Sequence, residues 1–110
     1  MAVDLHYRSL SDIYRAIKRG EISSCDVVEH QIERIAAHEP RLKSFARVLA
    51  EQAYEDAARL DEARRSGKEY GLLHGVPITL KDVFFTEGVE TASGTMVMAG
   101  YVPVEDATVV

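Results

Sequence analysis

Apolar side chains recur at helical spacing through the first half of the chain. They follow the pattern of one buried helix face in three stretches, which cover residues 9–20, 23–40 and 50–65. Between the last two stretches, residues 45–49 contain enough β-forming side chains for a short strand. The pattern therefore predicts a mainly helical region over residues 9–66.

Polar and special residues mark the ends of these predicted helices. Ser9 and Ser23 each precede a stretch and offer a side-chain oxygen to the free amides of a helix start. Gly20 is expected to end the first helix, and Gly67 lies just beyond the third. Pro40 is expected to end the second helix, because proline disfavours helical geometry in the residue before it.

After Gly71 the pattern changes from helix to strand. Residues 76–83 are apolar on both faces and rich in β-branched side chains, which is typical of a buried central strand in an α/β sheet. Residues 96–99 are expected to form a short helical turn, and Asp106 is expected to cap a helix that begins in the last four residues. The chain is therefore predicted to be of the α/β class.

Composition limits the functions that the chain can have. With 13 basic and 18 acidic residues the formal net charge is −5, which argues against direct binding of nucleic acid. The single cysteine, Cys25, cannot form an internal disulfide, which favours a reducing compartment. No signal peptide and no membrane-spanning run of about 20 apolar residues is evident. These features predict a cytoplasmic protein that does not act in a membrane.

Lys81 is the first candidate for chemistry, because it interrupts an apolar run. It is either a solvated strand end or a functional lysine at the carboxyl edge of a sheet, where α/β folds place their sites. In a strand, Asp82 points to the opposite side. Its carboxylate is then expected to accept hydrogen bonds from backbone or hydroxyl groups.

Other residue types offer weaker candidates. His30 and His38 are expected to be solvated on a helix flank, and His74 is expected to shape the entry to the strand. No two histidines have the spacing of metal ligands. Cys25 lies in the first turn of a predicted helix, where the helix dipole favours a thiolate, but no base partner is evident.

Three short motifs follow one another in the second half of the chain. Residues 71–83 read Gly-Leu-Leu-His-Gly-Val-Pro-Ile-Thr-Leu-Lys-Asp-Val, and residues 106–110 read Asp-Ala-Thr-Val-Val. Residues 88–95 read Gly-Val-Glu-Thr-Ala-Ser-Gly-Thr. Together these motifs resemble the amidase-signature family, the Ser-cisSer-Lys hydrolases, with Ala92 and Thr95 in place of the commoner Thr and Ser. The helical region is similar to that family as well.

The resemblance implies a role for Lys81 and a fold for the chain. Lys81 matches the family's general base, which draws a proton through a bridging cis-serine from a nucleophilic serine. Residues 1–110 would be the N-terminal portion of a single amidase domain, an α/β/α sandwich on a mixed β-sheet. Residues 9–66 would form its outer helices, and residues 71–110 would begin its catalytic sheet region, with a buried strand that carries Lys81.

A lysine base must be partly neutral to accept a proton. A free lysine side chain has a pKa of about 10.4, whereas a base that works at neutral pH needs a pKa of about 7 to 8. The apolar neighbours Leu80, Val83 and Phe84 are expected to supply part of that shift by desolvation.

The resemblance implies hydrolysis of a small-molecule carboxamide through a serine acyl-enzyme, with no metal or organic cofactor. Both serines are expected downstream of Val110, so the 110-residue chain alone is expected to be incomplete and inactive. Two alternatives stay open. One is the A subunit of a glutamyl-tRNA(Gln)/aspartyl-tRNA(Asn) amidotransferase, and the other is a non-catalytic binding fragment. A homodimer and amidotransferase partner subunits are both compatible with the sequence, which does not identify the substrate.

Overall fold

The computed structural model describes residues 4–68 and 71–110, which form two compact units. Unit 1 is Met1–Pro77 and unit 2 is Ile78–Val110. Unit 1 holds the long helices, and unit 2 is built mostly of turns and irregular backbone.

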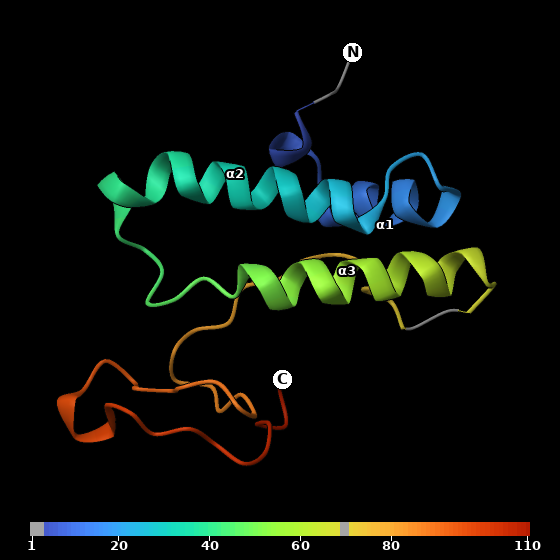
Figure 1. Ribbon diagram of the computed structural model, residues 1–110. Helices are drawn as coiled ribbons and strands as arrows, with labels where there is room; N and C mark the ends of the chain where they lie inside the picture. The colour runs from blue at the N-terminus through green and yellow to red at the C-terminus, as the bar shows by residue number, and fades with distance from the viewer. Residues whose placement is uncertain (1–3, 69–70) are drawn as a thin grey trace. The chain divides into compact units, whose positions relative to one another are not determined.

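Unit 1 contains three α-helices, α1 (Leu10–Arg19), α2 (Ser24–Leu42) and α3 (Ala50–Arg65). A short 3₁₀ helix, η1 (Leu5–Tyr7), precedes them. Helices α2 and α3 lie side by side and run in opposite directions (Figure 1). The helical region predicted from the apolar spacing is thus confirmed.

The predicted start signals cap these helices. The Ser9 hydroxyl oxygen accepts a hydrogen bond from the Asp12 backbone N–H at 3.2 Å, at the start of α1. At the start of α2, Ser23 Oγ accepts from the Asp26 N–H at 2.9 Å, and the Asp26 carboxylate accepts from the Ser23 N–H at 2.8 Å. This reciprocal capping box satisfies two amides that have no partner within the helix. Gly20 ends α1 at a φ of 72°, which an L-side chain rarely adopts.

The prediction that Pro40 ends the second helix is wrong, because α2 continues through it to Leu42. Proline lacks an N–H and therefore loses only one helical hydrogen bond in the last turn. The helix ends instead at Lys43, which has a φ of 50° and donates its N–H to the Glu39 carbonyl at 2.8 Å. The Glu39 carboxylate then accepts from the Phe45 N–H and the Ser44 hydroxyl, both at 2.8 Å.

Neither predicted strand is present in the described part of the chain, which contains only an isolated bridge between Thr86 and Val89. Residues 45–49 are a loop, and the run at 76–83 is irregular and largely exposed. Ile78, for example, is 60% exposed. A strand needs a neighbouring backbone to receive its hydrogen bonds, and no described segment runs along residues 76–83 to do so. The mixed sheet and the buried strand for Lys81 are therefore absent from these residues.

The core of unit 1 is small and lies where α1 meets α2. Ile13, Ile17 and Val27 form a buried apolar cluster. Three half-buried side chains pack against this cluster, namely Leu5, Ile22 and Val76. Through Val76, the segment that follows α3 comes into contact with the helices.

Unit 2 is held together by hydrogen bonds between distant turns. The N–H groups of Gly88, Thr91 and Ala107 donate to the carbonyls of Pro103, Tyr101 and Phe85, at 3.0, 2.9 and 2.8 Å respectively. Thr91 and Pro103 are its fully buried side chains among those described. The predicted turn at 96–99 is confirmed as the 3₁₀ helix η2 (Met96–Met98).

The prediction that Asp106 caps a helix in the last four residues is wrong, because residues 107–110 form only a turn, closed by the Val110 N–H on the Ala107 carbonyl at 2.8 Å. The Asp106 carboxylate accepts a hydrogen bond from the Glu87 N–H at 2.7 Å, so it joins two separate turns. In the part of the chain that the structure describes, no helix is long and apolar enough to cross a bilayer.

Replacing Ile17 with alanine should lower the free energy of unfolding by about 2–4 kcal/mol, because the side chain is fully buried in the apolar cluster of α1 and α2. Leu10→Ala is the matched control in the same helix, since Leu10 is 49% exposed and should lose less than about 1 kcal/mol. Urea denaturation followed by far-UV circular dichroism measures both. Equal losses for the two variants would contradict this description of the core.

Candidate functional site

Lys81 lies in irregular backbone at the start of unit 2, and its side chain is exposed. Its carbonyl oxygen accepts a hydrogen bond from the Phe84 N–H at 3.0 Å, which closes a turn. The expected desolvation is not seen, since Leu80, Val83 and Phe84 are themselves 41%, 43% and 39% exposed. The side-chain nitrogen of Lys81 is therefore open to solvent.

Asp82 joins the turn that carries Lys81 to the loop at residues 91–95. The Asp82 carbonyl accepts a hydrogen bond from the Ser93 N–H at 2.8 Å, and the carboxylate oxygen Oδ1 accepts from the Ala92 N–H at 3.3 Å. Ser93 has a φ of 52°, a left-handed conformation that turns its amide toward Asp82. The expectation that the Asp82 carboxylate accepts hydrogen bonds from the backbone is confirmed. Two of the three motifs are thus held together within unit 2.

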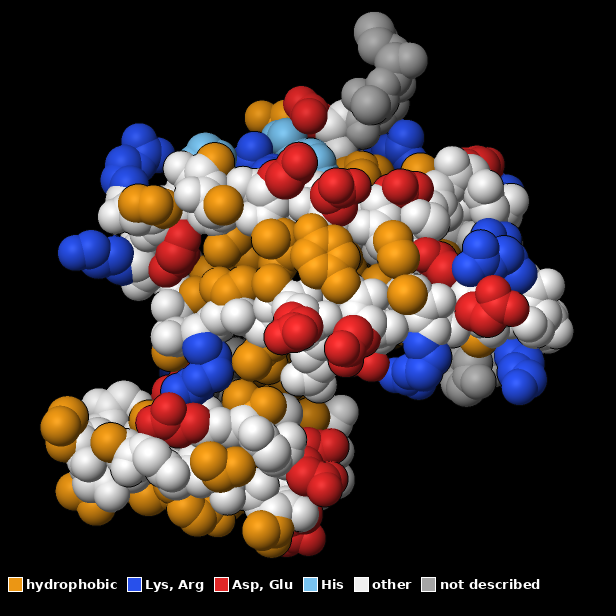
Figure 2. Space-filling view, viewed as in Figure 1, with side chains coloured by type: hydrophobic (Ala, Val, Ile, Leu, Met, Phe, Trp, Pro, Cys, Tyr) orange, Lys and Arg blue, Asp and Glu red, His pale blue; other side chains and the backbone are white. Residues whose placement is uncertain are grey.

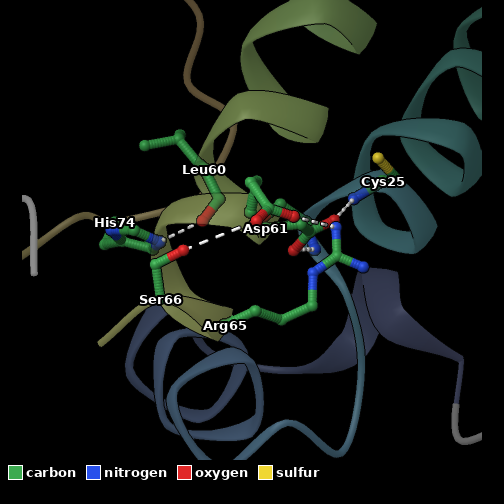
Figure 3. Close-up of polar contacts among 8 residues, drawn as sticks. Cys25, Leu60, Asp61, Arg65, Ser66 and His74 are labelled. Carbon is green, nitrogen blue, oxygen red and sulfur yellow. Dashed lines mark hydrogen bonds and ion pairs between the residues drawn. The ribbon is translucent and has the colours of Figure 1, made fainter. Parts of the chain in front are cut away.

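A second polar constellation lies in unit 1, around the carboxylate of Asp61 on α3 (Figure 3). Its two oxygens accept hydrogen bonds from the backbone N–H groups of Ser24, at 2.7 Å, and Cys25, at 3.1 Å. Asp61 is only 5% exposed. A side chain from α3 thus caps the first turn of α2, where the backbone amides and the helix dipole favour a negative charge.

The pKa of Asp61 is lowered by this arrangement. Burial alone would raise the pKa of the carboxyl group, but the hydrogen bonds from Ser24 and Cys25 favour the charged form and outweigh burial. Sequence reasoning missed Asp61. The available signal was its place four residues after Ala57, on the apolar stripe of the third helix, where an acidic residue is out of pattern.

The expectation that the helix dipole favours a thiolate at Cys25 is wrong. Its pKa is raised, first because the thiol is partly buried and then because the Asp61 carboxylate lies beside it. The helix dipole, which favours a thiolate, is outweighed by this nearby full negative charge. Cys25 is therefore a protonated thiol at neutral pH.

The segment that leads toward Lys81 is held against the same end of the helices. His74 Nε2 lies 2.9 Å from the Leu60 carbonyl oxygen, so this nitrogen carries the proton and donates it (Figure 3). Gly75 is buried at a φ of +77°, and a Cβ placed on it would lie 2.2 Å from Ser24 Oγ. His74 was predicted to shape the entry to a strand, but no strand follows in the described residues, and its imidazole instead holds this segment on α3.

Among the described residues, no group of three or more potential metal ligands occurs. His30 is half-buried rather than solvated, and its Nε2 lies 3.2 Å from Nδ1 of His6. The two rings are nearly parallel, at 10°, with centroids 5.3 Å apart. This hydrogen bond holds η1 on α2, which is a structural role.

An apolar groove of about 570 Å³ lies between the second half of α2 and the loop that follows it. Figure 2 shows hydrophobic side chains gathered along the line where α2 and α3 meet. The groove is lined by Ile32, Ile35, Ala36, Glu39, Pro40, Lys43, Phe45 and Val48. Its charged lining residues are Glu39, whose carboxylate is held by Ser44 and Phe45, and Lys43, which ends α2.

Comparison with known proteins gives a consistent result. The family model described as Amidase matches residues 26–110. The chain is 37% identical over 107 residues to the A subunit of the glutamyl-tRNA(Gln) amidotransferase from Chloroflexus aggregans, and 42% identical over 106 residues to that from Roseiflexus sp.. These matches cover 97% and 96% of this chain but 22% of each relative, so the chain spans about a fifth of their length.

A solved structure also matches the chain, with a TM-score of 0.85 and 28% sequence identity. It is described as "An unexpected vestigial protein complex reveals the evolutionary origins of an s-triazine catabolic enzyme". The match covers 91% of this chain and 22% of that one. The helical arrangement of these residues is thus one that a solved structure also adopts.

Asp61→Asn should lower the free energy of unfolding by about 1.5–3 kcal/mol at pH 7, because charge-assisted hydrogen bonds to Ser24 and Cys25 are weakened. The pKa of Asp61 is lower in the folded state, so the charge stabilises the fold above the unfolded-state pKa of about 3.9. This contribution should fade as the pH falls below about 4 and vanish once the folded carboxyl is protonated. Urea denaturation at a series of pH values measures it, with exposed Glu55→Gln as control. A stability difference between the parent and the Asp61→Asn protein that is independent of pH would contradict the assignment.

Asp82→Ala should destabilise unit 2 by about 1–3 kcal/mol, because it leaves the Ala92 N–H without its carboxylate partner. Asp82→Asn retains an acceptor oxygen and should lose less. Exposed Glu87→Ala in the same unit is the control and should stay within about 0.5 kcal/mol of the parent. Hydrogen exchange of the backbone amides of residues 78–110, followed by mass spectrometry under increasing urea, reports on this unit alone. An Asp82→Ala protein as stable as the control would show that the hydrogen bond contributes nothing.

Proposed function

This chain belongs to the amidase family, and we propose that it forms the N-terminal part of an enzyme that cleaves a carboxamide with Lys81 as its general base. The observation that carries the proposal is the family match over residues 26–110, which includes the Lys81–Asp82 motif. The geometry of unit 2 supports it, because Asp82 is engaged with the backbone at Ala92 and Ser93. Lys81 is then left with an exposed side chain that a second group can approach.

In the proposed reaction, the neutral amine of Lys81 takes a proton, through a bridging serine, from the hydroxyl of a nucleophilic serine. The serine oxygen attacks the amide carbonyl, and the resulting tetrahedral intermediate expels ammonia or an amine, which receives the proton. Water then hydrolyses the acyl-enzyme ester and regenerates the serine. The sum is amide plus water giving carboxylate plus amine. Both serines are placed downstream of Val110 in this proposal.

We further propose that residues 76–83 become a buried strand of the complete α/β/α domain. Unit 2 exposes an unusual number of large apolar side chains for its size. Ile78 and Leu80 are among them, as are Phe84 and Phe85. Pairing with strands from the rest of the polypeptide would cover these side chains and supply the desolvation that a lysine base requires.

A cytoplasmic location is consistent with the single cysteine.

A second candidate is favoured by the relatives themselves. The two from Chloroflexus aggregans and Roseiflexus sp. are both named as the A subunit of a glutamyl-tRNA(Gln) amidotransferase. In such a protein the same lysine chemistry would release ammonia from an amide donor and pass it to a misacylated tRNA, with the help of partner subunits. The net charge of −5 fits a polypeptide that leaves the contact with tRNA to those partners.

Lys81→Ala in the complete protein should lower amide hydrolysis by about 10⁴-fold, because the serine hydroxyl then has no base. Lys81→Arg should fail as badly, since a guanidinium group stays protonated at any usable pH. Lys68→Ala, at an exposed lysine of unit 1, is the control and should retain full activity. The measurement is ammonia release from L-glutamine, propionamide, benzamide and urea. A Lys81→Ala protein with about a tenth of wild-type turnover would remove Lys81 from the mechanism.

The same panel of amides separates the two candidate functions. Cleavage of simple amides by the complete protein alone supports an independent hydrolase. Release of ammonia from L-glutamine only after partner subunits and glutamylated tRNA are added supports a role within an amidotransferase.

A further inference from the structure

Two histidine rings meet where η1 lies on α2. Nδ1 of His6 lies 3.2 Å from Nε2 of His30, and the planes of the two rings differ by only 10°. The side chain of His6 is 18% exposed, and His30 is half-buried. The two nitrogens are therefore in direct contact, with water largely excluded from the rings.

The two facing nitrogens can hold one proton between them. A hydrogen bond between two imidazoles needs an N–H on one ring and a lone pair on the other. This condition is met when both rings are neutral, and also when one of them is charged. When both rings are charged, each facing nitrogen carries a hydrogen. The hydrogen bond is then lost, and two positive charges repel one another across 3.2 Å.

The position of η1 depends on contacts with the rest of unit 1. Its own hydrogen bonds run from the Tyr7 N–H to the Asp4 carbonyl, at 2.9 Å, and from the Arg8 N–H to the Leu5 carbonyl, at 3.1 Å. A 3₁₀ helix of one turn is not stable by itself in water. Leu5 packs against the buried apolar cluster, and the bond between His6 and His30 adds a polar contact. Loss of that bond therefore favours release of the segment.

Charged groups around the pair do not remove this limit. Oδ1 of Asp4, which is 62% exposed, lies 3.7 Å from Nδ1 of His6 and can balance one positive charge. Asp12 pairs with Arg15 at 3.6 Å, and Asp26 closes the capping box of α2. The titratable and charged groups within one turn of either histidine, or at the adjoining start of α1, are Asp4, Tyr7, Arg8, Asp12, Arg15, Asp26, Glu29, Glu33 and Arg34. Since no carboxylate lies between the facing nitrogens, a second proton breaks their bond.

We propose that His6 and His30 form a pH-sensitive latch, which holds η1 on α2 at neutral pH and releases it when both rings are protonated. Histidine side chains ordinarily change their charge between about pH 5 and 8. The released segment binds two protons on these rings, whereas the docked pair binds one. Because the released state binds more protons, docking weakens by up to about tenfold for each pH unit as the pH falls through this range. The latch is independent of the role proposed for Lys81.

Hydrogen exchange of the complete protein at about pH 7.5 and about pH 5 tests the latch. The readout is the protection of the backbone amides of residues 5–8, followed by mass spectrometry and corrected for the intrinsic effect of pH on exchange. We expect this protection to fall by about 10- to 100-fold in the wild type. The amides of α3, measured in the same samples, should stay protected, which separates release of η1 from unfolding of unit 1.

His30→Gln is the decisive variant, because glutamine keeps a donor and an acceptor but gains no proton in this pH range. The protection of residues 5–8 should then differ by less than about threefold between the two pH values, and His6→Gln should behave in the same way. His38→Gln is the matched control, since His38 lies on α2 about 12 Å further along the helix axis. It should keep the wild-type fall. An equal fall in His30→Gln and wild type, or no fall in the wild type, would overturn the proposal.

A second measurement on the wild type decides the case in which His30→Gln has already lost η1 at neutral pH. The nitrogen chemical shifts of ¹⁵N-labelled histidine report the protonation of each ring. We expect the second proton to enter the pair over the same pH interval in which residues 5–8 lose protection. Two charged rings with residues 5–8 still protected would overturn the proposal, as would release of these residues while the pair still shares one proton.

Discussion

The hydrogen bonds between Asp61 and the first turn of α2 are the interaction on which unit 1 depends most. They join α2 to α3 through a carboxylate that is almost completely buried. A buried charge is costly unless it is fully hydrogen-bonded, and here two backbone N–H groups without helical partners supply the bonds. The cost of burying Asp61 and the cost of burying the end of α2 are thus removed by the same contact.

This contact has chemical consequences for its surroundings. Together with partial burial, which is the larger cause, the negative charge of Asp61 raises the pKa of the adjacent Cys25 thiol. It also holds Ser24 in the place where Gly75 approaches. The buried carboxylate of Asp61 on α3 thus holds the first turn of α2, against which the segment after α3 packs.

In unit 2 an aspartate, Asp82, also accepts hydrogen bonds from backbone amides, but the apolar side chains around it stay exposed. Asp82 accepts hydrogen bonds from the Ala92 and Ser93 amides, through its carboxylate and carbonyl oxygens respectively, and so orders the turn beside Lys81. The apolar side chains of this unit stay exposed, because hydrogen bonds between turns bury little surface. The order of unit 2 is local, and it leaves the side chain of Lys81 exposed.

The sequence by itself determined the features of this protein that depend on near neighbours. The three helices, their serine caps at Ser9 and Ser23, the stop at Gly20 and the turn at 96–99 all follow from residues within a few positions of one another. The motif around Lys81 also identified the family, since it depends on residue order alone. Only the tertiary structure decided whether residues 76–83 form a strand, which partner Asp61 caps, and that Gly75 lies against Ser24. Asp61 and Ser24 are far apart in the chain, and a strand exists only where another backbone completes its hydrogen bonds, so no local pattern carries that information.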